Sequence, residues 1–249
     1  MAIEDISKKQ QHKLVWSADT DIGPVRKENE DSFVVVEPST FVIADGMGGY
    51  AAGEVASRIL TDTAKEQLTG EANITELSLK QVITQANRIV VEEAGKSQDK
   101  QGMGTTATLC HIEGDTVYWA HVGDSKLYHL HAGKLNQITK DHTYANLLVD
   151  RGEATPADAA KNASANMLTR AIGVDNVVFA DTGSFNIENG DKLVLCTDGL
   201  SGALSESAMC DLLNDSASEA EAKTLVRAAL NFGSRDNVTA IVVTVAGYC

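Results

Sequence analysis

Short apolar runs and two longer amphipathic stretches follow one another along the first part of the chain. Residues 14–18, 33–36 and 41–44 are short and largely apolar, as strands are, and the polar residues 37–40 break the last two like a hairpin turn. Within residues 52–68 and 74–94, apolar side chains recur at three- and four-residue spacing, which is typical of amphipathic helices. The pattern therefore predicts three strands and then two helices.

The second part of the chain repeats this order. Apolar runs at 106–112, 116–122 and 126–131 are separated by three-residue polar turns, which predict antiparallel neighbours. Polar, alanine-rich residues 141–166 are typical of a lid-like insert. Further strands are expected at 177–187, 192–196 and 238–245, with helices near 206–213 and 217–231 between the last two.

Helix pairs that alternate with groups of strands favour packed sheets with the helices outside, which is an α+β fold. The chain contains no repeat, linker or low-complexity segment. We therefore expect a flexible polar arm at residues 1–12 and a single domain at 13–249.

Charge and cysteine spacing exclude several classes of function. The formal net charge of -14 over 249 residues repels nucleic-acid backbones, and the 21 basic residues form no run that could offset it. The four cysteines share no C-x-x-C spacing, so neither a zinc cluster nor a redox pair is indicated. Because no signal-peptide pattern and no apolar stretch of ~20 residues occurs, we expect a cytoplasmic protein without nucleic-acid or membrane partners.

Aspartates recur where apolar strands end or begin, each next to a glycine or a small polar residue. Turn chemistry explains any one of these aspartates, since Asp-Gly and Asp-Asn are favoured turn dipeptides. Four of them in one chain indicate carboxylates gathered at one edge of a sheet, where hard divalent cations would offset their repulsion. These residues are Asp45, Asp124, Asp198 and Asp236.

Arginine, glutamate and histidine side chains are the other candidates for chemistry. Arg26, in the charged segment 23–31, offers a planar fork for two phosphate oxygens, and Glu30 in the same segment is a candidate metal ligand. His142 adjoins Asp141 at the start of the insert and is expected to be a structural tie. Four further histidines lie in predicted strands and are also expected to be structural: His111, His121, His129 and His131.

Taken in order, these segments resemble the metal-dependent protein phosphatases of type 2C, in particular the bacterial serine/threonine phosphatases. The resemblance runs from Gly23 to about Thr239. Its motifs are short, but their order and spacing are specific. They are Arg26-x-x-Asn29-Glu30-Asp31, Asp45-Gly46-Met47-Gly48-Gly49, Gly104-Thr105-Thr106, Gly123-Asp124-Ser125, Asp141-His142, Leu168-Thr169-Arg170-Ala171-Ile172-Gly173, Thr197-Asp198-Gly199 and Asp236-Asn237.

The resemblance implies a four-layer α-β-β-α sandwich, two antiparallel sheets flanked by helix pairs, with two Mn²⁺ or Mg²⁺ ions at one end. Asp45 would bridge both ions. Asp198 and Asp236 would complete one ion's shell, while the Gly46 carbonyl and, through water, Glu30 would serve the other ion. A hydroxide between the metals would attack phosphoserine or phosphothreonine.

The remaining roles also follow from the resemblance. Asp124 would hold, with Asp198, a weaker third ion, and Arg26 would bind and orient the phosphate. The insert at about 142–166 would form a flap beside the site. We expect a monomeric signalling hydrolase that acts on phosphorylated proteins, among them a cognate serine/threonine kinase and its substrates.

The chain departs from the family beside the D-G-x-G-G motif, where relatives carry a histidine as candidate general acid. Here the positions hold Met47 and Tyr50, so a metal-bound water or another acid must protonate the leaving group. Residues 162–166 also replace the usual His-Pro-x-Arg-Asn. Two alternatives therefore stay open: a regulatory pseudo-phosphatase that only binds phosphoproteins, and a phosphatase of small molecules.

Overall fold

The computed structural model describes residues 11–49, 52–215 and 220–248, and its strands form two packed antiparallel sheets. The first sheet has the order β1 (His12–Asp21), β11 (Val238–Tyr248), β10 (Lys192–Cys196), β7 (Lys126–His131) and β8 (Lys134–Gln137). The second has the order β2 (Asp31–Val36), β3 (Thr40–Met47), β5 (Ala107–Glu113), β6 (Thr116–Val122) and β9 (Asp181–Asn186), with β4 (Gly104–Thr105) beside β3.

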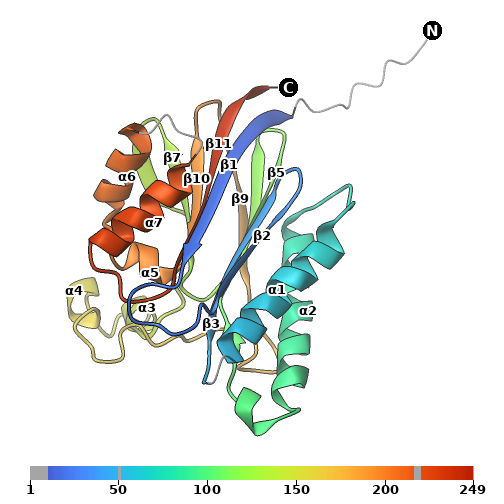
Figure 1. Cartoon of the computed structure of the whole chain (residues 1–249), viewed down its shortest axis with the longest axis vertical. Coiled ribbons are helices and arrows are strands. Elements are labelled where there is room, and N and C mark those ends of the chain that lie inside the picture. The colour runs from blue at the N-terminus through green and yellow to red at the C-terminus, as the bar shows by residue number, and fades with distance from the viewer. Residues whose placement is uncertain (1–10, 50–51, 216–219, 249) are drawn as a thin grey trace.

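Helices cover the outer face of each sheet (Figure 1). The second sheet is covered by α1 (Ala52–Leu68) and α2 (Glu76–Ala94). The first is covered by α5 (Asp198–Ser201), α6 (Glu206–Asp215) and α7 (Glu221–Asn231). The four-layer α-β-β-α sandwich expected from the sequence is therefore confirmed.

Strands buried on both faces explain why their sequences run apolar without alternation. In β10, Leu193 and Leu195 pack between the two sheets, while Val194 and Cys196 face the helices α6 and α7. Each such leucine stabilises the fold by about 1.5–3 kcal/mol. The core is thus divided into one layer between the sheets and one beneath each helix pair.

The turn at Gly123–Ser125 is a correction to the sequence analysis. It was expected to join two antiparallel neighbours, but β6 pairs with β5 and β9, whereas β7 pairs with β10 and β8. The chain crosses here from one sheet to the other. Gly123 has a φ of 106°, which favours glycine, and its N–H donates to His142 Nδ1 at 3.1 Å. The backbone is therefore held in the crossing by a residue far along the chain.

Element boundaries differ from the expectation at a few other places. The predicted strand 177–187 is wrong at its start, because β9 begins at Asp181 and the side chains of Val177 and Phe179 are 65% and 71% exposed. The helix expected at 217–231 is α7, which begins at Glu221, and residues 216–219 lie outside the described residues. Strand β8 was not expected from the sequence, and a tight turn at residues 132–133 joins it to β7.

The insert at 142–166 carries two short helices, α3 (Tyr144–Asp150) and α4 (Pro156–Ala159), and a 3-10 turn at Gln98–Lys100 precedes β4. Most of the expected arm lies outside the described residues, but His12, its last member, is buried at the start of β1. The division into an arm, a single domain at 13–249 and a flap stays a prediction.

None of the helices in the described part of the chain is long and apolar enough to cross a membrane. The cytoplasmic location stays a prediction.

Candidate active site

A cavity of about 230 Å³ opens where β3 and β10 end and β11 begins. The structure brings to this cleft every residue that the sequence analysis selected for metal or phosphate chemistry: Arg26, Glu30, Asp45, Gly46, Asp124, Asp198 and Asp236. They come from β3, from the first residue of α5 and from three loops, so only the packed sandwich places them together.

Asp45 occupies the end of β3, and its backbone is fixed on both sides. Its N–H donates to Thr106 Oγ1 at 2.9 Å, and its carbonyl oxygen accepts from the Thr106 N–H at 2.9 Å. Burial, reinforced by neighbouring carboxylates such as Asp31 and Asp198, raises the pKa of Asp45 well above its usual range. This carboxylate thus lies where a negative charge requires a compensating cation.

Asp198 and Asp236 lie close because two loops touch through their backbones. Asp198 is the first residue of α5, directly after β10, and Gly199 follows it. A Cβ on Gly199 would lie 1.9 Å from the Asn237 carbonyl oxygen, so only glycine allows this approach. Burial and the charge of Asp236 raise the pKa of Asp198.

Gly46 and Glu30 also lie against neighbouring backbone, at the N-terminal end of α1. The Gly46 N–H donates to the Glu30 carbonyl at 3.1 Å, and a Cβ on Gly46 would lie 2.2 Å from the carbonyl oxygen of Gly53. Glu30 Oε1 accepts from the Gly53 N–H at 3.2 Å, while burial raises the pKa of this glutamate. The expected metal ligand Glu30 therefore has a fixed place beside the Gly46 backbone.

Arg26, expected to bind phosphate, pairs with Asp236 instead. Its Nη2 lies 2.6 Å from Asp236 Oδ2, and both side chains are partly exposed. An exposed ion pair contributes only about 0–1 kcal/mol, so a stronger partner can displace either member. The Arg26 guanidinium thus lies at the cleft and can exchange Asp236 for another anionic partner.

Asp124 sits on the turn that crosses between the sheets. Burial, and next the charge of Asp198, raises the pKa of this carboxyl to about 7, although Lys126 acts in the opposite direction. The Lys126 ammonium donates to the Asp124 carbonyl and pairs with the carboxylate of Asp141. The Lys126 ammonium therefore offsets the negative charge of the Asp124 carboxylate less than its proximity suggests, because it pairs with another carboxylate.

Asp31 is a buried carboxylate that pairs opposite Asp45 and to which no role was assigned from the sequence. Its Oδ2 accepts from Thr197 Oγ1 at 2.9 Å and from Thr239 Oγ1 at 2.6 Å, while its buried Oδ1 has no hydrogen-bond partner among the described residues. Burial raises its pKa to about 7. Its position directly opposite Asp45 in the β2–β3 hairpin was the available signal.

Asn237 is a second such residue, and it joins the loop that carries Arg26 to the start of β11. Its Oδ1 accepts from the Glu30 N–H at 2.9 Å. Its amide nitrogen donates to the carbonyls of Ile22 at 2.9 Å and Glu28 at 3.0 Å. One amide side chain thus holds both ends of the loop.

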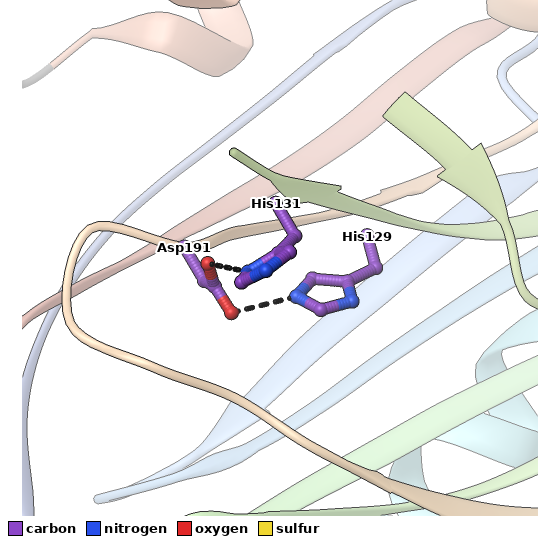
Figure 2. Close-up of side chains that lie close together, drawn as sticks. All are labelled: His129, His131 and Asp191. Carbon is purple, nitrogen blue, oxygen red and sulfur yellow. Dashed lines mark hydrogen bonds and ion pairs between the residues drawn. The ribbon is translucent and has the colours of Figure 1, made fainter. Parts of the chain in front are cut away.

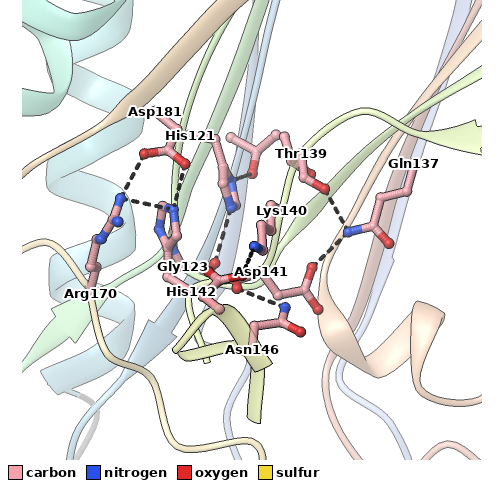
Figure 3. A network of polar contacts seen from close by, with 12 residues as sticks. His121, Gly123, Gln137, Thr139, Lys140, Asp141, His142, Asn146, Arg170 and Asp181 are labelled. Atoms are coloured by element: carbon pink, nitrogen blue, oxygen red, sulfur yellow. Dashed lines mark hydrogen bonds and ion pairs between the residues drawn. The ribbon is translucent and has the colours of Figure 1, made fainter. Parts of the chain in front are cut away.

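A polar network ties the insert to the crossing turn (Figure 3). His142 accepts from the Gly123 N–H through Nδ1, and its Nε2 lies 3.1 Å from Asp181, which also pairs with Arg170 at 2.6 Å. Burial lowers the pKa of His142. His142 thus has the structural role expected of it, since it links the insert to the crossing turn and to Asp181. Asn166 and Leu168, at the end of the insert, line the cleft.

The family's histidine position is occupied by Met47, which lines the cleft. Its methyl group covers the small residue Gly104, where an added Cβ would lie 2.7 Å from Met47 Cε. Tyr50, the other candidate, lies outside the described residues. Met47 has no ionisable proton to give, so it cannot act as the general acid that the resemblance implies at this position.

The donor set of the cleft fits hard divalent cations. It consists of oxygen atoms only, from carboxylates whose neighbours raise one another's pKa, and hard cations such as Mg²⁺ and Mn²⁺ prefer such ligands. The buried Asp31 Oδ1, which has no hydrogen-bond partner among the described residues, is a feature that a bound cation or its water shell would explain.

Comparison with known proteins gives one consistent result. Residues 26–232 match the model of the protein phosphatase 2C family. A serine/threonine phosphatase of Listeria welshimeri is 37% identical over 236 residues, which cover 90% of this chain and 93% of the relative.

Solved structures agree with this match. The serine/threonine phosphatase Stp1 of Staphylococcus aureus superposes with a TM-score of 0.89 at 30% identity, covering 98% of this chain and 100% of the other. The catalytic domain of the phosphatase PstP, in complex with two manganese ions, has a TM-score of 0.84 at 34% identity, covering 94% and 98%.

Proposed function

Because this chain belongs to the protein phosphatase 2C family, we propose that it hydrolyses phosphoserine and phosphothreonine in phosphorylated proteins with the help of Mn²⁺ or Mg²⁺. The observation that carries the proposal is the convergence of Asp45, Asp198 and Asp236 on one cleft beside Arg26. Such a cluster repels a phosphate dianion unless cations reverse the local charge.

The cations would be held by the residues that already share the cleft. Asp45 would help to hold both ions, Asp198 and Asp236 would hold one, and the Gly46 carbonyl and, through water, Glu30 would hold the other. Asp124, together with Asp198, would supply a weaker third site. Two cations in this position supply positive charge against the phosphate oxygens and lower the pKa of a nearby water.

Arg26 would bind the substrate once Asp236, its present partner, holds a cation instead. When Asp236 acts as a cation ligand, its hold on the guanidinium weakens. The planar fork of Arg26 can then pair with two phosphate oxygens, which a lysine could not do with the same geometry. Arg26 thereby orients the dianion for in-line attack and gains interaction as charge shifts in the transition state.

The alternative of a binding-only pseudo-phosphatase is less well supported. Its basis was the replacement of the usual histidine by Met47 and Tyr50. The acidic residues expected to hold the cations are nevertheless all present in the cleft, and the Listeria welshimeri relative, 37% identical to this chain, is named a phosphatase. Both observations favour hydrolysis. A cognate kinase as substrate, a monomeric state and the absence of nucleic-acid or membrane partners stay predictions.

The experiment is phosphate release from phosphoserine and phosphothreonine peptides after chelator treatment and addition of Mn²⁺ or Mg²⁺. We expect turnover only with a cation, and its loss in Asp45→Asn, which removes a ligand charge without changing size. Asp62→Asn, an exposed position on α1, makes the same charge change away from the cleft and should stay active. Tight peptide binding without product in the cation-loaded protein would overturn the proposal.

A further inference from the structure

Two histidines and an aspartate meet at the end of the sandwich opposite the cleft. His129 and His131 are two positions apart on β7, so their side chains share one face of the strand. Asp191 lies just before β10, one position beyond the register pair of Lys192 with Leu130. Figure 2 shows both imidazole rings turned toward the Asp191 carboxylate, with His129 Nε2 and His131 Nδ1 each 2.8 Å from one of its oxygens.

The cluster borders the apolar layer between the two sheets. Leu127 and Leu193, on the same faces of β7 and β10, belong to that layer, and the ring of Phe185 from the other sheet lies 4.9 Å from the His129 ring. The Asp191 side chain is only 5% exposed and that of His129 13%, whereas that of His131 is 46% exposed. One ligand position therefore faces solvent, and two are enclosed.

The carboxylate is charged despite its burial. Burial acts to raise the pKa of Asp191, but the Glu188 N–H, which donates to Oδ2 at 2.9 Å, and the two imidazoles together lower it. A buried, ionised carboxylate must be hydrogen-bonded or paired. In the structure the two rings are its side-chain partners, and a nitrogen of each ring lies within hydrogen-bond distance of the carboxylate.

The donor atoms are also spaced for one metal ion, because one from each residue lies within 4.8 Å of the others. Zinc takes nitrogen at about 2.0–2.1 Å and carboxylate oxygen at about 2.0–2.2 Å, so a shared ion needs ligand atoms roughly 3.3 Å apart. The Glu188 N–H already orients the carboxylate, as outer-shell donors do at metal sites.

We propose that His129, His131 and Asp191 form an accessory metal site that binds Zn²⁺ or a similar transition-metal ion. Imidazole ligands favour such ions over Mg²⁺ and Mn²⁺, in contrast to the all-oxygen cleft. The exposed side of His131 leaves room for water as a fourth ligand. The five residues of β10 separate Asp191 from the cleft by about 17 Å. The ion would pin the β9–β10 connection to β7 and stabilise that end of the sandwich.

The test is Zn²⁺ binding to the full chain in an Asp45→Asn/Asp198→Asn background, which weakens binding by the cleft. Chelator-treated protein is titrated with Zn²⁺ by calorimetry, while imidazole signals are followed by NMR. We expect one Zn²⁺ per chain and shifts confined to His129 and His131. His131→Gln should weaken binding by about 10-fold or more. His111→Gln, at a partly buried strand histidine elsewhere, should leave it unchanged.

Stability and activity separate the site from a merely structural cluster. Zn²⁺ should raise the melting temperature of the background protein but not that of its His131→Gln form. In the otherwise unchanged chain, His131→Gln should keep the Mn²⁺-dependent activity, since the cluster lies far from the cleft. If Zn²⁺ does not bind, or binds equally to the His131→Gln form without shifting these two imidazoles, the cluster is hydrogen-bonded only and the proposal fails.

Discussion

Asp31 offers a quantitative test of the electrostatics of the cleft. Burial raises its pKa from an ordinary value of 3.8 to about 7. A carboxyl with a raised pKa holds its proton more tightly in the folded state, so the contribution of Asp31 to the free energy of unfolding is most favourable at low pH. This contribution is lost as the pH rises from about 4 to about 7.

The magnitude follows from this shift. In the metal-free protein, ionisation of Asp31 should lower the free energy of unfolding by about 2–3 kcal/mol between pH 5 and pH 8. Asp31→Asn places a neutral amide in the same space, and its oxygen can still accept from Thr197 and Thr239. The variant should therefore gain stability over the unmodified protein by that amount across this pH range.

The assay is urea unfolding followed by circular dichroism, with a chelator present, at both pH values. The quantity of interest is the change with pH of the difference between the two proteins, which cancels any constant cost of the amide. Asp62→Asn serves as the control, because it removes an exposed charge of α1. If the difference between Asp31→Asn and the unmodified protein is the same at both pH values, the electrostatic account of the cleft is wrong.

Three further changes test other parts of the site. Gly46→Ala puts a Cβ 2.2 Å from a carbonyl oxygen of α1 and should cost about 1–3 kcal/mol in urea unfolding, whereas Gly49→Ala meets nothing within 4 Å and should not. Asn237→Ala frees the loop that carries the phosphate-binding arginine. It should raise the Mn²⁺ concentration for half-maximal activity about 10-fold, and an unchanged requirement would refute its positioning role. Asp141→Asn leaves the largely buried Lys126 without its carboxylate and should cost about 1–3 kcal/mol in thermal unfolding; no loss would show that the pair is not stabilising.

The sequence predicted the elements whose signals are local. The helix at 52–68 and the strands at 116–122, 126–131 and 192–196 have the bounds that their apolar patterns indicated. The strand predicted at 177–187 failed over its first four residues, because Val177 and Phe179 are exposed rather than packed. Apolar side chains predict a strand only where a sheet is available to bury them.

The candidate site divides in the same way. Aspartates at strand ends identified four of the cleft carboxylates, because a turn residue next to a buried strand leaves a local pattern. Asp31 also stands at a strand start, within the motif that contains Asn29 and Glu30, but its place beside Asp45 depends on the pairing of β2 with β3. Arg26 was selected correctly as a cleft residue, but its partner Asp236 lies 210 positions away along the chain. Such contacts are set by how the sheets pack, not by spacing.

By itself, the sequence determined which residues could carry the chemistry and most of the strands and helices that present them. Only the tertiary structure decided that Gly123–Ser125 crosses between sheets, that Asn237 holds the phosphate-binding loop, and that His129 and His131 face Asp191. The physical reason is range. Periodicity and turn chemistry act over a few residues, whereas strand pairing and sheet packing join segments whose distance along the chain no local pattern records.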